Sequence, residues 1–306
     1  STTADMDFGG AIYKFDGGTT FTAVSTGTMD MAAAVAFTTA ADNIEFATAG
    51  IELANGANLN IDTGAAGGNI TVGGAIGGVS VETVTLDAGT GTTSVAAIGS
   101  STQIGALSIG TSDNGGITLN GAIVTDGAVV IDGPVTLATG AVSVTTTDDA
   151  LTFNHTIDGA QALTLVSGTA ATAIQGEIGG STAISSLTIT NGTAAGTIEI
   201  TNIGGVTGAT SIGNTNTATL TLDGTAYTTT GAQTYTAKAG QNIDITGTNA
   251  TFTTTNSNIG FATAGVDLAN NGTTTINTGA GGGTVSFGAA LESNGGNNDL
   301  LVITSG

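Results

Sequence analysis

An internal repeat constrains the fold of this chain more than any other feature. Residues 43–76 recur, without a gap, at residues 258–291, which is 215 positions later. Shorter matches, marked by Phe46, Phe153 and Phe261, return at about half that interval. Self-similarity at a fixed period is typical of solenoids, propellers and tandem arrays, in which one structural unit is stacked many times.

The repeats divide the chain into about three units of about 105 residues each. Their approximate bounds are 1–117, 118–221 and 222–306, and the last unit is incomplete. Because no linker-like break separates the units, we expect one continuous solenoid over residues 1–306. Both ends of the sequence fall inside a unit, so we also expect the natural protein to continue beyond residue 306.

Within a unit, two apolar residues repeatedly flank one polar residue. Residues 70–72, 84–86 and 107–109 follow this pattern. Such alternation predicts short β-strands with one buried face. The pattern recurs at short and fairly even intervals, with Gly, Asn, Asp or Ser in between. No apolar stripe with the period of a helix is present, so we expect an all-β chain.

Two all-β architectures fit this spacing: a parallel β-helix (β-solenoid) and tandem immunoglobulin-like β-sandwiches. A sandwich core is about 10 Å thick and needs bulky side chains, whereas only 4% of the residues are aromatic and 51 are Gly. A β-helix has a narrow core and tight corners. We therefore predict a right-handed parallel β-helix with roughly 20 residues per coil, or about 15 coils, and keep tandem sandwiches as the alternative.

Three segments resemble the repeats of giant filamentous-haemagglutinin-type bacterial surface proteins. They are TIDGAQALTL at 156–165, TAISSLTI at 182–189 and AYTTTGAQTY at 226–235. The resemblance covers most of residues 40–290 and is specific for the repeat class. It implies a secreted, right-handed β-helical shaft on the outside of a bacterium.

The charge of the chain excludes several partners. Its net charge is −21, and Lys14 and Lys238 are its only Lys or Arg residues. Nothing is therefore available to neutralise the phosphates of a nucleic acid or the headgroups of an anionic membrane. The most apolar run, residues 32–37, is too short to span a bilayer. We expect neither nucleic-acid binding nor membrane insertion.

Residues that could carry catalysis are scarce. His155 is the only imidazole, and there is no Cys and no GxSxG motif. Asp148 and Asp149 form the only adjacent acidic pair, and neighbouring residues of a strand point to opposite faces. We expect no enzyme activity and assign no catalytic or cofactor-binding residues.

Calcium is the one ion for which the sequence offers candidate ligands. Asp16, Asp132, Asp158 and Asp223 each precede a Gly, and carboxylates in such loops suit calcium. Asp299 lies in a Gly- and Asn-rich tail that partly matches the calcium nonapeptide. The alternative is that Asp-Gly only forms turns, so we assign no metal site and keep these five residues as candidates.

Taken together, these features favour a structural function. We expect the shaft or fibre-forming segment of a secreted bacterial surface adhesin or extracellular filament. The alternative is a calcium- or glycan-binding tandem-repeat adhesin module. The expected partners are other copies of the chain, end to end or side by side, or the rest of a longer chain. A host or neighbouring-cell surface is a further candidate partner.

The three tyrosines, Tyr13, Tyr227 and Tyr235, are expected to pack at coil ends.

Overall fold

A computed structural model describes residues 5–23, 27–110, 115–193, 195–268, 272–293 and 299–305. These residues form 36 short strands and no helix. The strands pair in parallel and stack as a β-solenoid of about 12 turns. This confirms the all-β prediction and the parallel β-helix. Tandem immunoglobulin-like sandwiches were the wrong alternative, because their sheets are antiparallel.

The chain divides into two compact units. Unit 1 contains Ser1–Asp149 and Phe153–His155, and unit 2 contains Ala150–Thr152 and Thr156–Gly306. Strand β19 (Leu151–Phe153) lies at their boundary. The division into three repeats of about 105 residues stays a prediction from the sequence.

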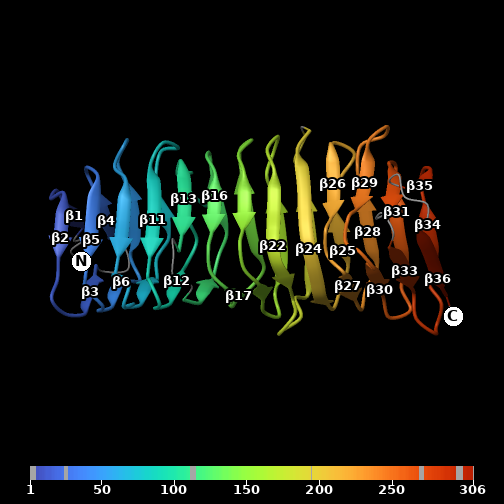
Figure 1. The fold of residues 1–306 in the computed structure, drawn as a ribbon. Helices are drawn as coiled ribbons and strands as arrows, with labels where there is room; N and C mark the ends of the chain where they lie inside the picture. The colour runs from blue at the N-terminus through green and yellow to red at the C-terminus, as the bar shows by residue number, and fades with distance from the viewer. Residues whose placement is uncertain are drawn as a thin grey trace. The chain divides into compact units, whose positions relative to one another are not determined.

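In unit 1, the turns contribute strands to three columns, and strands of one column lie side by side, as β11, β13 and β16 do in Figure 1. The first column contains β1 (Met6–Phe8), β4 (Thr28–Met31), β7 (Gly50–Leu53), β10 (Ile76–Gly77), β15 (Ile123–Thr125) and β18 (Val142–Thr146). The second contains β2 (Ile12–Lys14), β5 (Val35–Thr38), β8 (Leu59–Asp62), β11 (Thr83–Asp87), β13 (Ala106–Ile109) and β16 (Val129–Ile131). The third contains β3 (Thr19–Thr22), β6 (Ile44–Ala47), β9 (Ile70–Val72), β12 (Thr93–Val95), β14 (Ile117–Leu119) and β17 (Val135–Leu137).

Unit 2 has the same three-column construction. One column contains β21 (Ala162–Val166), β23 (Ser186–Thr190), β25 (Thr210–Ile212), β28 (Gln233–Thr236), β31 (Ile259–Ala262) and β34 (Val285–Phe287). The longer strands β22 (Thr172–Ile178) and β24 (Thr197–Val206) each run through the other two columns. The second column continues with β26 (Thr219–Leu222), β29 (Asn242–Ile245), β32 (Gly265–Leu268) and β35 (Leu291–Ser293). The third contains β20 (Ile157–Asp158), β27 (Ala226–Thr229), β30 (Thr251–Thr253), β33 (Thr273–Asn277) and β36 (Leu300–Thr304).

The turns are longer than the sequence analysis predicted. Leu59 pairs with Val84 on the next turn, and Ile259 pairs with Val285 in the same way. The predicted coil length was too short because a turn holds up to three strands together with their connecting loops. About 12 turns therefore account for the chain, which is fewer than predicted.

The core is built from the alternation that the sequence shows. In β8, Leu59 and Ile61 point inward and are buried, while Asn60 between them is exposed. Parallel pairing without a register shift places inward residues of successive turns on one another, so that Leu59, Val84 and Leu107 form one apolar ladder. Each such side chain contributes about 1.5–3 kcal/mol by burial.

Aromatic rings form stacked ladders inside the core. The ring centroids of Phe21 and Phe46 lie 4.9 Å apart in unit 1, and those of Tyr227 and Phe252 lie 4.7 Å apart in unit 2. Tyr227 and Tyr235 have no exposed surface. Two of the three tyrosines therefore pack within the core, because in-register stacking lets one ring lie on the next.

The two copies of the long repeat adopt the same local structure. Ile44 pairs with Ile70 in the first copy, and the equivalent residues Ile259 and Val285 pair in the second. A polar contact is repeated as well: the side-chain oxygen of Asn43 accepts the N–H of Asn69 at 2.8 Å, and that of Asn258 accepts the N–H of Thr284 at 2.9 Å. The repeat thus specifies one turn together with the first strands of the turn that covers it.

Candidate functional site

The calcium candidates lie on separate turns, where they support the backbone. Asp158 Oδ1 accepts the N–H groups of Ser181 and Thr182, one turn later, at 2.8 and 2.9 Å. Asp223 Oδ1 accepts the hydroxyl of Thr246 at 2.9 Å. These bonds tie successive turns together, so both carboxylates have a structural use.

Two further candidates lie near the ends of the chain. Asp16 is exposed in the turn after β2, and the Asp299 carboxylate accepts the hydroxyl of Ser293. The Gly- and Asn-rich tail before Asp299 falls mostly outside the described residues. Among the residues that the structure describes, no three His, Asp or Glu side chains form a group that could hold a metal ion.

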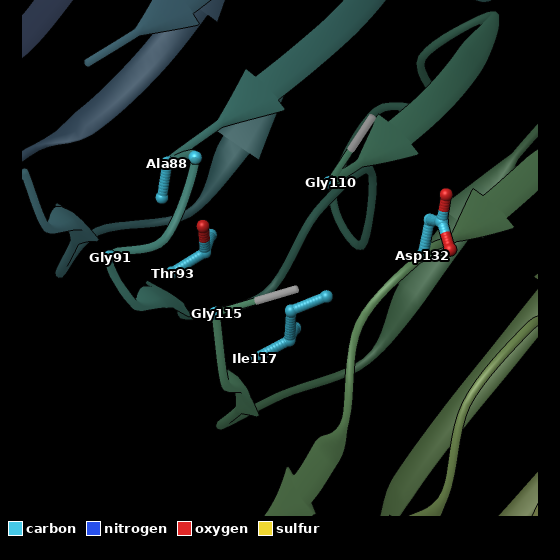
Figure 2. A pocket seen from close by; sticks show the side chains of 8 residues that line it. Ala88, Gly91, Thr93, Gly110, Gly115, Ile117 and Asp132 are labelled. Carbon is cyan, nitrogen blue, oxygen red and sulfur yellow. The ribbon is translucent and has the colours of Figure 1, made fainter. Parts of the chain in front are cut away.

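Asp132 is the fifth candidate, and it faces the only histidine. Asp132 Oδ1 lies 3.2 Å from His155 Nε2, and both side chains are partly exposed. Asp132 also lines a cavity of about 10 Å³ beside Thr93 and Ile117, which Figure 2 shows from close by. That volume holds about one water molecule, whereas small-molecule sites usually measure about 300–1,000 Å³. This cavity is therefore far too small for an organic ligand.

Two acidic ladders run across successive turns. Asp7, Asp30 and Glu52 are in-register neighbours on β1, β4 and β7. Burial raises the pKa of Glu52, and the neighbouring charge of Asp30 raises it further. The structure therefore stacks three carboxylates in register, although like charges on facing strand positions repel one another.

The second ladder has the same layout in unit 2. Asp244, Asp267 and Glu292 are register neighbours on β29, β32 and β35. Burial raises the pKa of Asp244, and the charge of Asp267 adds to that shift. The amide of Asn242 donates a hydrogen bond to Asp267 Oδ2 at 2.7 Å, which partly offsets the repulsion.

Glu82 is a buried carboxylate that is held by backbone groups. Its Oε2 accepts the N–H of Val79 at 2.7 Å and that of Val81 at 3.3 Å, and its Oε1 accepts the N–H of Gly56 at 3.1 Å. Burial opposes ionisation, but these backbone hydrogen bonds outweigh it and lower the pKa of Glu82. The side chain thus holds together three loop N–H groups from two turns.

A buried polar network in unit 2 also has its hydrogen bonds satisfied. Gln233 Nε2 donates to the carbonyl oxygens of Tyr227 and Thr253 at 2.8 and 2.9 Å, and the Tyr235 hydroxyl donates to Gln233 Oε1 at 3.1 Å. Burial raises the pKa of Tyr235. Its hydroxyl therefore stays protonated at neutral pH and serves to fix the register of the core.

Large apolar side chains are exposed at several places along the described part of the chain, among them Val79 and Val81 in unit 1, which are 53% and 59% exposed. In the last turn, Leu291, Leu300 and Ile303 are 39%, 54% and 47% exposed. In the first turn, Ile12 is 61% exposed, and the core residue Phe21 is only half-buried. Leu291 and Ile303 are in register with the buried residues Val266 and Ile276 and so face inward. Ile12 and Leu300 stand at outward-facing positions, in register with Ala36 and Thr273.

Sequence reasoning found none of the buried polar groups and neither acidic ladder. Neighbouring members of the ladders, such as Asp30 and Glu52, are separated by a full turn, and the turn length varies along the chain. No fixed sequence spacing therefore marks them. Glu82 carries no signal either, because its partners are backbone N–H groups, which almost every residue type supplies.

No protein-family profile, curated protein sequence or solved structure matches this chain. The resemblance to filamentous-haemagglutinin-type repeats therefore stays a prediction. Within the described part of the chain, no helix has the length and apolar character needed to cross a membrane.

Proposed function

We propose that this chain is a structural shaft or fibre-forming segment of a secreted bacterial surface adhesin or extracellular filament. The observation that carries the proposal is the repeated hydrogen bonding between turns. Ile70 N–H bonds to the carbonyl of Thr92 at 2.8 Å, and Leu107 N–H bonds to that of Ala128 at 3.0 Å. Stacked turns of this kind resist bending and separation because many backbone bonds would have to break together.

The polar side chains support the same function. Asp158 and Glu82 bond to backbone N–H groups, and Gln233 bonds inside the core. Their chemistry is used to fasten turns to one another. A shaft needs such fastening and no reaction centre, so we infer that the chain has no catalytic activity.

The calcium- or glycan-binding module has less support. Asp158 and Asp223 use carboxylate oxygens for bonds to the next turn. Tyr227 and Tyr235 are buried, so their rings are not available to stack on a sugar.

Small-angle X-ray scattering of the purified chain tests the shaft. A stiff solenoid with turns spaced by about 4.8 Å gives the scattering of an elongated particle with a constant cross-section. A curve that fits a flexible string of beads overturns the proposal.

The location is tested separately. Antibodies against the chain should label intact cells of the producing bacterium without permeabilisation. Labelling that requires permeabilisation overturns the extracellular assignment and leaves the structural one to be judged by scattering.

A further inference from the structure

One column of strands in unit 2 carries no charged side chain. It contains β21, β23, β25, β28 and β31, of which the last three can be followed from turn to turn in Figure 1. None of these five strands contains Asp, Glu, Lys, Arg or His. The second column of the same unit, in contrast, carries Glu199, Asp244 and Asp267 at outward positions. A chain with 23 acidic residues thus keeps this column uncharged.

Hydroxyl groups line up on the outward side of the uncharged column. Four successive turns place a hydroxyl residue at the same register position: Thr164, Thr188, Ser211 and Thr234. Each of them stands between two buried residues and so points outward. Thr190 and Thr236 stand two residues further along β23 and β28 and form a second, shorter row. Because no register shift interrupts the pairing of these strands, the rows form a regular array.

The hydroxyls of the longer row are not used to hold the fold together. Other threonines of the chain do fasten loops: Thr229 Oγ1 donates to the carbonyl of Gly231, and Thr254 Oγ1 to that of Ser257, both at 2.6 Å. Among the residues that the structure describes, the side chains of Thr164, Thr188, Ser211 and Thr234 have no hydrogen-bond partner. A hydroxyl both donates and accepts hydrogen bonds, so the row offers both to a molecule outside the chain.

We propose that this hydroxyl face, made of Thr164, Thr188, Ser211, Thr234, Thr190 and Thr236, binds the surface of ice. Register neighbours on adjacent strands lie about 4.8 Å apart, and alternate residues of one strand lie about 6.6 Å apart. Oxygen atoms on the faces of hexagonal ice repeat at two similar distances. Water molecules bound to the hydroxyls can therefore occupy positions of the ice lattice. This inference goes beyond the proposed structural function and does not depend on it.

The side chains of the hydroxyl face are suited to a rigid lattice. Threonine is branched at Cβ and restricted in χ1, so its hydroxyl is held near one position before ice is met. Charged groups bind water strongly in their own geometry, and the five strands of this column contain none. The outward residues beside the hydroxyls are small or apolar, as Ala162, Val166 and Gly260 show. Little on this face therefore competes with the order of the ice surface.

Two other occupants fit the hydroxyl face less well. Five strands of about four residues give a face of roughly 24 by 13 Å, or about 300 Å², whereas a stable protein interface buries about 800 Å² on each partner. A second copy of the chain would therefore be held only weakly here. A polysaccharide surface calls for exposed aromatic rings, but Tyr235 and Phe261, the aromatic residues of these strands, are buried.

Thermal hysteresis tests the proposal with ice itself as the probe. Ice-binding proteins lower the temperature at which a small ice crystal grows below the temperature at which it melts. Solutions of the purified chain should show such a gap, and the gap should increase with concentration. The chain should also be enriched in slowly grown ice, from which proteins that do not bind ice are excluded.

Substitutions locate the binding surface. Thr188→Tyr and Thr234→Tyr each place a bulky ring on the hydroxyl face, and each should abolish the hysteresis and the enrichment. Thr221→Tyr is the matched control, because Thr221 points outward on β26 in register with Glu199 and Asp244, away from the hydroxyl face. It should behave as the wild type. Circular dichroism should give the same unfolding midpoint for all three variants, since each position is on the surface.

A milder variant covers the case in which a tyrosine disturbs the fold. The triple variant Thr164→Val, Thr188→Val and Thr234→Val keeps the shape of each side chain and removes the hydroxyls, and it should reduce the hysteresis severalfold.

A chain without hysteresis and without enrichment in ice at every concentration overturns the proposal. Folded Thr188→Tyr with unchanged hysteresis, or an equal loss in Thr221→Tyr, does so as well. Scattering of a stiff, elongated particle would leave the structural function in place after any of these results, so the two failures can be told apart.

Discussion

Asp244 and Asp267 occupy register-matched positions on neighbouring turns, and the pKa of Asp244 is raised by its burial and by the charge of Asp267. The two carboxylates point outward from β29 and β32, so the stack brings like charges together. A solenoid cannot avoid such contacts where its sequence repeats an acidic residue once per turn. The repulsion between the two carboxylates lowers the stability of the folded chain at this position.

Removing one of these charges should stabilise the chain. We expect Asp244→Asn to raise the free energy of unfolding by about 0.5 kcal/mol, because like charges on facing strand positions are destabilising. Urea denaturation at pH 7 measures the change, with the exposed Asp16→Asn variant as control.

The same carboxylate, Asp244, should make the stability of the folded chain depend on pH, and the direction of the pKa shift fixes the sign of that dependence. The folded pKa of Asp244 lies above its unfolded value, so protonation adds stability that is fully present below the unfolded pKa. That stability is lost as the pH rises through the folded pKa. The advantage of Asp244→Asn over the wild type should therefore shrink as the pH falls from neutral into the acidic range. A difference that is constant with pH would contradict the like-charge explanation.

Adjacent glycines should respond very differently to a methyl group. A Cβ on Gly115 would lie 1.3 Å from the carbonyl oxygen of Gly91 on the preceding turn, whereas a Cβ on Gly116 would meet nothing within 4 Å. We expect Gly115→Ala to cost about 2 kcal/mol or more, since the backbones must move apart. Gly116→Ala should change stability by less than about 0.5 kcal/mol. Equal denaturation midpoints for the two variants would show that the turns are not packed this closely.

Glu82→Gln should destabilise the chain at neutral pH. The variant keeps the shape of the side chain but loses the charge that three backbone N–H groups bind, a change worth about 1.5–3 kcal/mol. The folded pKa of Glu82 is lowered, so its contribution is present above the unfolded pKa and is lost as the pH falls through the folded pKa.

Thermal unfolding of Glu82→Gln and wild type should therefore converge at low pH, where the wild-type carboxyl is protonated. Glu199→Gln, at an exposed position of β24, serves as the control and should match the wild type throughout. A stability gap that persists below the pH at which Glu82 protonates would contradict the role assigned to its charge.

Calcium should have little effect on stability. The carboxylate of Asp158 accepts two backbone N–H groups, and Asp223 accepts a hydroxyl from the next turn. We expect thermal unfolding in millimolar calcium and in excess chelator to give the same midpoint. An unfolding midpoint that rises with calcium would contradict this expectation and would support the calcium-binding alternative, with Asp158 and Asp223 as the first ligands to test.

The local strand pattern was predictable from sequence because burial alternates along the strands. Leu59 and Ile61 are buried on either side of the exposed Asn60, as the alternation of apolar and polar residues requires. The solenoid was predictable because 43–76 and 258–291 repeat a whole turn. Turn length was not predictable, because the loops between strands vary and only pairing fixes them.

The contacts between turns were beyond prediction for the same reason. Asp244 and Asp267 become neighbours only through the length of one particular turn, and Tyr227 reaches Phe252 in the same way. The exposure of Leu291 could not be predicted from the sequence either, because its position in the repeat matches that of the buried residue Ile76. Position along the stack, and not residue type, decides whether such a side chain is buried.

Electron cryo-microscopy of the native material on the cell surface tests the central claim most directly. The structural shaft predicts antibody-labelled projections that are stiff and show a layer spacing of about 4.8 Å along their axis. Separate globular beads joined by flexible links, or the absence of the chain from any surface projection, would contradict it.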